Sequence, residues 1–495
     1  MAQSNTLKVM KGVSSQTLVT IGIGIVEIVY FSIMSRLLTR EDFGLFAALT
    51  AITSIFFSIS DAGIGSALIQ RKEMTEEFKN TAFTLSVVVS GFVALLLLIL
   101  SGPIANAIVG ETLHYPLMLM ATTIFFNGMI SVNFGWLRRN LHFLKAGAIQ
   151  LIAFLISSLI AIIMAIEGYG FYAILFKVVA SSLLTLIISF FFVGTKFRIG
   201  ITRQHIKPIV HFGGWLTASV IIHSISSQID RLLMSRLLSV EALGAYNRPK
   251  EFILQIGTRI NGIFDTALFP VLSSIQDNLE SLRNAFNRSQ YFMNICSMAL
   301  ALAFICNAGL MIRIFFGEQW IDLKPIFQII ALTLIFNING RLGDCYLRSL
   351  GLVQQQFNLR VFELIVDIIC ILIGFRFGIM GVAIGFLIGN IILICTKTIY
   401  LAWKMNISIR DIVNNVLGGW AYGFYFLPLI IAQYSIIPET WSGDILSAIL
   451  FTILMVSLFL IWPKLIGHQY EKEGVNRLHS FILTKIQKSG HVIKL

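Results

Sequence analysis

Charged side chains are scarce in this chain. Asp, Glu, Lys and Arg make up 13% of its 495 residues, whereas soluble domains carry about a quarter. Proline is also scarce, with nine residues, so long helices can run without interruption. No polar stretch is long enough to form a separate soluble domain. These shortages exclude an ordinary soluble multidomain protein.

Cysteine and known catalytic motifs are equally sparse. The five cysteines lie in apolar stretches without metal-ligand spacing, so we expect small buried hydrophobes and neither disulfides nor a metal site. The sequence has no Walker A motif, no HExxH and no Cys/His cluster, which excludes ATP hydrolysis by this chain and implies no cofactor. The predicted outer loops are short, which argues against a membrane glycosyltransferase or polymerase. We therefore expect a protein that is not an enzyme.

Apolar residues make up most of the chain. The chain is 56% hydrophobic, contains 40 phenylalanines and has a mean hydropathy of +0.83. A membrane span needs about 20 mostly apolar residues. This length predicts an all-α, polytopic membrane protein with about fourteen transmembrane helices. The spans are expected at 16–36, 43–68, 81–101, 115–136, 147–166, 170–194, 209–234, 244–270, 290–312, 325–347, 358–377, 380–402, 416–436 and 444–462.

A motif in the first part of the chain returns 200 positions later. Residues 34–46 read MSRLLTREDFGLF, and residues 234–246 read MSRLLSVEALGAY. Two further pairs follow in the same order at offsets of about 210: WLR at 136–138 with YLR at 346–348, and GYGFYAI at 168–174 with GIMGVAI at 378–384. Internal repeats of this size in an apolar protein are typical of secondary transporters. We expect two six-helix lobes in parallel repeat, followed by an extra helix pair.

The repeats and loop charges predict the domain organisation. We expect a first lobe at 1–194, a basic cytoplasmic linker at 195–208, a second lobe at 209–404, an extra helix pair at 405–463 and a basic tail at 464–495. The net charge of +12 reflects Lys and Arg in cytoplasmic loops rather than a nucleic-acid partner. Both termini are then cytoplasmic. The segment 477–488 is basic and amphipathic, and lies either on membrane lipids or free in solvent.

Ionisable residues inside the spans are costly and usually functional. Arg259 stands out because a guanidinium at mid-depth stays charged and needs a partner or an aqueous cavity. Its alternative is a structural pair with Asp265 or Glu27. His223 is either functional or a hydrogen-bonded residue between helices. The other candidates in or near the spans are Asp61, Lys177, Arg341 and Asp367.

The residues at this point resemble a known family. SDAGIGSALIQR at 60–71, LGAYN at 243–247 and FPVLS at 269–273 are similar to helices of bacterial polysaccharide flippases in the multidrug/oligosaccharidyl-lipid/polysaccharide exporter superfamily, in the branch of O-antigen, colanic-acid and teichuronic-acid transporters. The resemblance covers nearly the whole chain and rests on structural rather than catalytic motifs. It implies alternating-access translocation of undecaprenyl-pyrophosphate-linked oligosaccharides across the bacterial inner membrane, for surface polysaccharide or lipopolysaccharide biosynthesis.

This resemblance gives the polar residues candidate roles. Arg259, Arg341 and Lys177 would meet the pyrophosphate, and amides such as Asn127 and Asn337 would meet the sugar. Glu27, Asp61, Asp265 and His223 would bind a coupling ion, H⁺ or Na⁺, since no nucleotide site supplies energy. The partners implied are the lipid-linked oligosaccharide, membrane lipids and the polysaccharide polymerase machinery. A cation-coupled multidrug efflux antiporter and a lipid II flippase remain alternatives.

Overall fold

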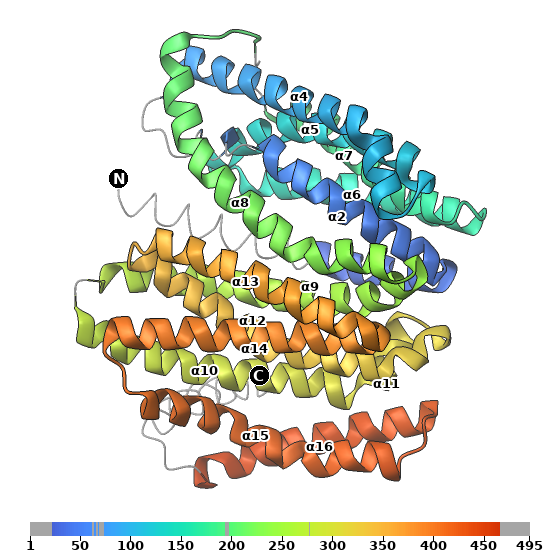
Figure 1. Cartoon of the computed structure of the whole chain (residues 1–495), viewed down its shortest axis with the longest axis vertical. Coiled ribbons are helices and arrows are strands. Elements are labelled where there is room, and N and C mark those ends of the chain that lie inside the picture. Colours follow the sequence, from blue (N-terminus) through green and yellow to red (C-terminus); the bar gives the residue numbers. More distant parts are fainter. Residues whose placement is uncertain are drawn as a thin grey trace, which may run out of the picture. The chain divides into compact units, whose positions relative to one another are not determined.

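In the computed structural model, the described residues run from 22 to 465, apart from 62–63, 66–67, 69–73, 194–197 and 277. Positions 1–21 and 466–495, with the predicted amphipathic segment of the tail, lie outside them. Several side chains within helices, including that of Asp265, also lie outside the described part. Every element of the described chain is helical (Figure 1), which confirms the all-α prediction.

Each predicted span overlaps one long helix in the described part of the chain. The helix at 22–37 is followed by α2 (Arg40–Asp61), α4 (Glu76–Ile108), α5 (His114–Arg139), α6 (Phe143–Ile166), α7 (Phe171–Val193), α8 (Arg203–Leu237), α9 (Val240–Ser274), α10 (Leu279–Cys306), α12 (Lys324–Ser349), α13 (Val353–Gly374), α14 (Gly378–Met405), α15 (Ile409–Ser435) and α16 (Trp441–Leu465). The shorter α11 (Ala308–Phe315), η1 (Glu111–Leu113), η2 (Glu318–Leu323) and η3 (Phe375–Phe377) connect them.

Length and hydropathy mark these helices as membrane spans. Nine helical segments in the described part are long and apolar enough to cross a membrane, and α15, bent by 47°, makes a tenth when its two parts count as one span. The helix at 22–37 is described over too few residues to be counted, and α8 and α9 are not among the nine. The protein is therefore a multi-pass membrane protein.

Local sequence explains where several helices begin. Thr75 precedes α4 and its side chain accepts a hydrogen bond from the backbone N–H of Phe78. Asn278 does the same for α10 and Ser408 for α15. These side chains satisfy N–H groups that the first turn of a helix leaves unpaired. The starts of α4, α10 and α15 are thus encoded by single polar residues next to apolar runs.

The chain divides into two compact units. Unit 1 comprises Met1–Ile256, Ile312–Ile330 and Leu352–Leu393, and unit 2 comprises Gly257–Met311, Ala331–Gly351 and Ile394–Leu495. The division falls within α9, α11, α12 and α14, so these units are not the lobes expected from the repeats. The boundaries of the two six-helix lobes stay a prediction, and each unit is described below by itself.

Small residues allow close helix packing in unit 1. Helix α4 lies along α5, and α6 lies along α7. Ser86 of α4 donates a hydrogen bond of 2.7 Å to the carbonyl oxygen of Gly128 in α5. A Cβ atom at Gly128 would lie 2.3 Å from Ser90 Oγ, so only glycine fits this contact. Membrane helices commonly pack in this way, because small residues let their backbones approach.

The repeated motif forms a reciprocal crossing in unit 1. A Cβ atom at Gly44 would lie 1.8 Å from the carbonyl oxygen of Val240, and one at Gly244 would lie 1.8 Å from that of Arg40. Positions 44 and 244 are equivalent in the repeat, as are 40 and 240. The two helix starts therefore touch in a two-fold manner, with the same positions used on both sides. This contact brings the two copies of the motif together at the first turns of α2 and α9.

Candidate functional site

A cavity of about 740 Å³ opens in unit 1. Its walls come from the helix at 22–37 and from α2, α5, α6 and α7, with Val220 of α8. Among its described lining residues are the carboxylates Glu27 and Asp61 and the guanidinium of Arg138. Hydroxyl and amide groups of Ser58, Asn127, Ser131, Gln150, Ser181 and Thr185 complete its polar surface. The cavity thus combines charged groups with many neutral hydrogen-bonding groups.

The predicted residues Glu27, Asp61 and Asn127 meet at this cavity. The Asp61 carboxylate accepts a short hydrogen bond from the hydroxyl of Ser131, and its side chain is otherwise exposed. Asn127 donates a hydrogen bond to Ser60 Oγ over 3.4 Å. Three residues from three separate spans therefore share one surface. The sequence predicted their spans but offered no signal that they meet.

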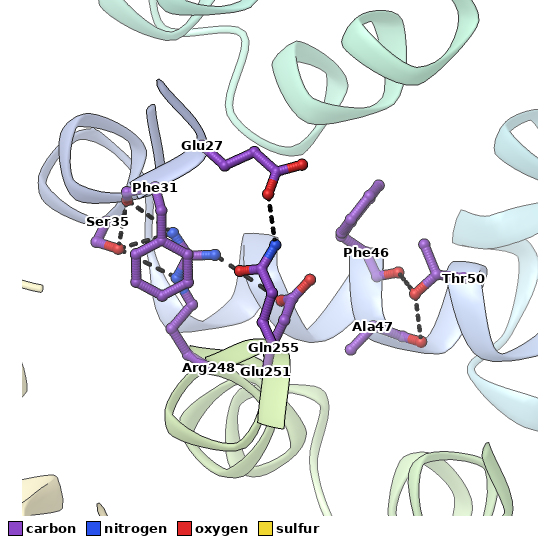
Figure 2. A network of polar contacts seen from close by, with 9 residues as sticks. All are labelled: Glu27, Phe31, Ser35, Phe46, Ala47, Thr50, Arg248, Glu251 and Gln255. Atoms are coloured by element: carbon purple, nitrogen blue, oxygen red, sulfur yellow. Dashed lines mark hydrogen bonds and ion pairs between the residues drawn. The ribbon is translucent and has the colours of Figure 1, made fainter. Parts of the chain in front are cut away.

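Glu27 also joins the cavity to α9. Its carboxylate accepts a hydrogen bond of 2.9 Å from the side-chain amide of Gln255 in α9. One turn before Gln255, Glu251 lies 3.9 Å from a guanidinium nitrogen of Arg248. Figure 2 shows these side chains lying between the helix at 22–37 and α9. The hydrogen bond between Glu27 and Gln255 thus joins the helix at 22–37 to α9.

The guanidinium of Arg248 is held from several sides. It donates hydrogen bonds to the carbonyl oxygen of Phe31 (2.8 Å) and to Ser35 Oγ (2.7 and 3.1 Å). Its central carbon lies 3.2 Å from the ring centre of Phe31 and 4.0 Å from that of Phe43, at cation–π distance. Sequence reasoning missed Arg248, although its place four residues after the repeated glycine at 244 was a possible signal.

A second buried charge pair lies beside the repeated motif. The ammonium of Lys250 forms a close ion pair with the carboxylate of Asp230. The same carboxylate oxygen accepts a hydrogen bond of 2.9 Å from the hydroxyl of Tyr246. Lys250 and Asp230 are both buried, so the pair is shielded from solvent and lipid. Neither Asp230 nor Lys250 is among the candidate residues predicted above from the sequence.

The hairpin that carries Arg36 and Arg40 is fixed by polar contacts. Arg40 forms an ion pair of 2.6 Å with Asp322 of η2, and Arg36 donates to the carbonyl oxygen of Ile314 over 2.9 Å. The carboxylate of Asp42 accepts from Thr39 Oγ1 (2.7 Å) and from the backbone N–H of Phe171 (2.7 Å). These contacts hold the first copy of the motif against α7 and η2.

The other candidate residues predicted from the sequence do not line the cavity of unit 1. Lys177 of α7 is half-buried, with its ammonium 3.9 Å from the ring centre of Tyr30 and 4.3 Å from that of Phe154, and it does not line the cavity. His223 is exposed on α8. Arg259, Arg341 and Asn337 belong to unit 2, where Arg341 is exposed and the other two are half-buried. The side chain of Asp265 lies outside the described part, so its expected role stays a prediction.

Unit 2 contains a comparable pair. The ammonium of Lys397 in α14 lies 3.1 Å from a carboxylate oxygen of Asp344 in α12, and both side chains are buried. Asp344 belongs to the polar face of α12 that also carries Asn337 and Arg341. Lys397 thus joins this face of α12 to α14. No group of three or more His, Cys, Asp or Glu side chains that could hold a metal ion occurs among the described residues.

Comparison with known proteins identifies the family of this chain. Residues 33–325 match the model of a family described as polysaccharide biosynthesis protein. The chain is 25% identical to the lipopolysaccharide biosynthesis protein WzxC of Escherichia coli (strain K12) over 88% of both chains. It is 24% identical to the teichuronic acid biosynthesis protein TuaB of Bacillus subtilis (strain 168), over 68% of this chain and 71% of TuaB.

A solved structure agrees with the fold. The lipid II flippase MurJ in an inward closed conformation superposes with a TM-score of 0.68, at 17% identity, over 90% of this chain and 98% of that one. At this identity the likeness concerns the fold alone, and it confirms a polytopic helical membrane protein. The family model covers more than half of the chain, including both copies of the repeated motif. The chain therefore belongs to the polysaccharide biosynthesis protein family.

Proposed function

We propose that this protein is a flippase that moves undecaprenyl-pyrophosphate-linked oligosaccharides across the bacterial inner membrane by alternating access. The observation that carries the proposal is the similarity to WzxC, a lipopolysaccharide biosynthesis protein, along 88% of both chains. The polar cavity of unit 1 supports it, because a sugar chain needs hydrogen-bonding groups on its way through the membrane. Both termini are proposed to be cytoplasmic, from the loop charges.

The substrate has two polar parts that call for different residues. The sugar is neutral over most of its surface and matches the amides and hydroxyls of the cavity, including Asn127 and Gln150. The pyrophosphate is an anion and calls for guanidinium groups, for which Arg259 and Arg341 are the proposed ligands. Arg138, which lines the cavity, adds a cation that the sequence alone did not assign to this role. Lys177 and Asn337 remain further candidates.

The direction of transport is proposed to be set by an ion gradient, with H⁺ or Na⁺ bound by Glu27 and Asp61. Both carboxylates line the cavity, where a cation can reach them. Glu27 is also hydrogen-bonded to Gln255 of α9, so a change at Glu27 reaches a helix of the predicted second lobe. His223 and Asp265 keep the same proposed role, and the polysaccharide polymerase machinery is the proposed downstream partner.

The main test follows the lipid-linked sugar in cells. Removing the gene should stop surface polysaccharide and leave lipid-linked oligosaccharide in the inner leaflet, which a membrane-impermeant sugar oxidant reaches only after permeabilisation. Restoring the gene should restore both readings. Normal polysaccharide together with increased drug sensitivity would indicate a multidrug antiporter instead. Rescue of cells depleted of their lipid II flippase would indicate lipid II as the substrate.

Arg259→Ala is the first test of the proposed site. If Arg259 binds the pyrophosphate, this variant should lose export by at least tenfold while its amount in the membrane stays normal. Arg259→Lys keeps the charge but loses the planar fork, so partial export is expected. Arg410→Ala, at an exposed position in the first turn of α15, is the matched control. A low amount of Arg259→Ala protein would indicate a structural role, and normal export at normal amount would exclude binding.

Glu27→Gln and Asp61→Asn test the coupling role. Each substitution keeps the shape of the side chain but removes the charge that would bind H⁺ or Na⁺. We expect about tenfold slower flipping in proteoliposomes with an imposed ion gradient, and little difference between variant and wild type without one. Glu111→Gln, at an exposed carboxylate of η1, is the control. An unchanged response to the gradient in both variants would exclude these carboxylates as the coupling site.

A further inference from the structure

Five aromatic rings pack together at the hairpin end of unit 1, and we call them the aromatic cluster. Phe31 and Phe43 lie on either side of the first hairpin, Phe252 lies in α9, Phe316 follows α11, and Trp320 lies in η2. Neighbouring ring centres are 5.2–6.4 Å apart, and all five side chains are buried. Rings packed in this way leave little room for water between them.

The aromatic cluster joins the two predicted lobes. Two of its rings belong to the predicted first lobe and three to the predicted second lobe. Polar contacts follow the same route, because the side-chain N–H groups of Gln319 and Trp320 each donate 2.9 Å to the carbonyl oxygen of Ser35. The segment Ile312–Ile330 accordingly packs in unit 1, although the residues directly before and after it belong to unit 2. The first hairpin is therefore held by residues from far along the chain.

The guanidinium of Arg248 lies inside this cluster, against the ring of Phe31 (Figure 2). Its hydrogen bonds go to the carbonyl oxygen of Phe31 and the hydroxyl of Ser35, which are neutral groups of the other predicted lobe. By contrast, Lys250 of the same helix forms its close ion pair with Asp230, within its own lobe. Separating a buried ion pair leaves an unpaired charge, whereas water can replace neutral acceptors around a guanidinium. The contacts of Arg248 between lobes are thus of a kind that can open.

An ion pair crosses between the predicted lobes at the edge of the cluster. Arg40 lies 2.6 Å from the carboxylate of Asp322, and the two side chains are 27% and 57% exposed. Arg40 also donates 2.7 Å to the carbonyl oxygen of Gln319. Exposed ion pairs contribute little to stability, because water competes for both charges. This edge can therefore also separate without leaving a buried charge behind.

The cavity of unit 1 lies beyond the cluster along the helix at 22–37. Glu27 lines the cavity, whereas Ser35 pairs with Arg248. Glu27 and Ser35 are eight residues apart, or about 12 Å along a helix. The cavity extends to Asp61 and Arg138, in the last turns of α2 and α5, and none of its described lining residues belongs to the hairpin at 36–42. The aromatic cluster therefore lies between the cavity and the hairpin end of α2.

We propose that the aromatic cluster, Arg248 and the Arg40–Asp322 pair form a gate that closes the cavity toward the hairpins and parts when substrate leaves on that side. This inference rests on the proposed transport function, because alternating access requires an opening on each side in turn. With cytoplasmic termini the hairpins face the periplasm, so the gate is the exit. Arg248 is a positioning residue, since it ties the helix at 22–37 to α9 and touches no substrate.

Bridging Arg40 and Asp322 tests whether the gate must part. With the five native cysteines replaced by serine or alanine, Arg40→Cys and Asp322→Cys are joined by a bifunctional methanethiosulfonate that a reductant removes. Proteoliposomes carry the lipid-linked oligosaccharide extracted from cells that lack the gene, and the impermeant sugar oxidant reports its flipping. We expect the bridge to slow flipping at least tenfold and reduction to restore it.

A second bridge, within the predicted first lobe, is the control. A Cβ atom at Gly102 of α4 lies 3.5 Å from the ring of His114 in α5, so Gly102→Cys with His114→Cys can be joined in the same way, and this bridge should leave flipping unchanged. Unchanged flipping with the Arg40–Asp322 bridge would overturn the gate. No flipping by the unbridged protein would count against the proposed function instead, and the reactivity test below then decides the gate by itself.

The reactivity of Ser35→Cys tests the gate without transport. Ser35 is buried, so Ser35→Cys should react slowly with a hydrophilic maleimide in nanodiscs. Adding Arg248→Met removes the hydrogen bonds that hold the helix at 22–37 to α9, and we expect reaction at least fivefold faster in protein that runs as a single species on size exclusion. Arg376→Met, at an exposed position of η3, should leave the rate unchanged.

Arg40→Ala provides the same test at the exposed edge of the gate, and it decides the result if Arg248→Met does not fold. It removes the contacts with Asp322 and Gln319, so Ser35→Cys should again react faster. A rate that stays unchanged in folded Arg248→Met and in Arg40→Ala would show that these residues do not hold the helices together, and would overturn the gate.

Discussion

At the scale of single residues, the buried ion pair of unit 1 shows how a membrane protein keeps charges among apolar helices. Lys250 and Asp230 pair with each other, and Tyr246 donates to the same carboxylate. The ring centre of Phe386 lies 4.0 Å from the Lys250 ammonium, which adds a cation–π contact. Each charge therefore has a partner within the protein.

Lys250→Met should destabilise the folded protein by about 3–5 kcal/mol, because it leaves the Asp230 carboxylate buried without its counter-charge. The double variant Asp230→Asn with Lys250→Met removes both charges and should recover most of the loss. Melting of the purified protein in detergent, followed by size exclusion, measures both. Lys404→Met, at an exposed lysine in the last turn of α14, is the control. A single variant as stable as wild type would show that the pair contributes nothing.

Single residues of the candidate site also differ in whether the sequence could predict them. Glu27, Asp61 and Asn127 were identifiable one at a time, because a polar group inside an apolar run is visible in the sequence. Their meeting at one cavity was not, since it depends on the rotation of three helices about their axes. Arg248 and Lys250 lie inside the predicted span 244–270 and were missed, because nothing near them in the sequence indicates their partners. Their burial depends on Ser35, Phe31 and Asp230, more than fifteen residues away in the chain.

At the scale of elements, each copy of the repeated motif forms the hairpin between two helices. The first helix ends at residue 37, α2 begins at Arg40, α8 ends at Leu237 and α9 begins at Val240. The glycine four residues into each new helix lets it cross the start of the other. Nothing in the sequence indicated that the two hairpins touch, because a pairing of copies is a tertiary property. Alternating access requires such contacts between lobes to part at one stage of the cycle.

Gly44→Ala should weaken this crossing. The new methyl group would overlap the carbonyl group of Val240, and overpacking of this kind costs about 1–3 kcal/mol. We expect a lower melting temperature by several degrees, and the same for Gly244→Ala, whose methyl group would meet Arg40. Gly340→Ala in α12, where a Cβ atom has open space, is the matched control. If Gly44→Ala melts like the control, the close crossing does not describe the folded protein in the membrane.

At the scale of the whole molecule, the chain is a polytopic helical protein of the family to which the comparisons assign it. The helices were predictable almost one for one, because a span leaves a run of apolar residues that no other structure explains. The boundaries of the two lobes stay a prediction from the repeats. The compact units split α9, α11, α12 and α14, because they reflect which helices pack together and not which segments of the sequence are similar.

The parallel arrangement of the repeats predicts that Glu41 and Glu241 face the same side of the membrane. Both are exposed next to the hairpins, and twelve predicted spans in two equal lobes place equivalent hairpins on one side. With cytoplasmic termini, that side is the periplasm.

In a cysteine-free background, Glu41→Cys and Glu241→Cys should react with an impermeant maleimide in intact cells stripped of their outer barrier. His142→Cys, in an exposed loop between α5 and α6, should react only after the membrane is opened. If Glu41→Cys and Glu241→Cys react from opposite sides of the membrane, the parallel repeat is wrong. If both react only after the membrane is opened and His142→Cys reacts in intact cells, the orientation of the chain is the reverse of the one proposed.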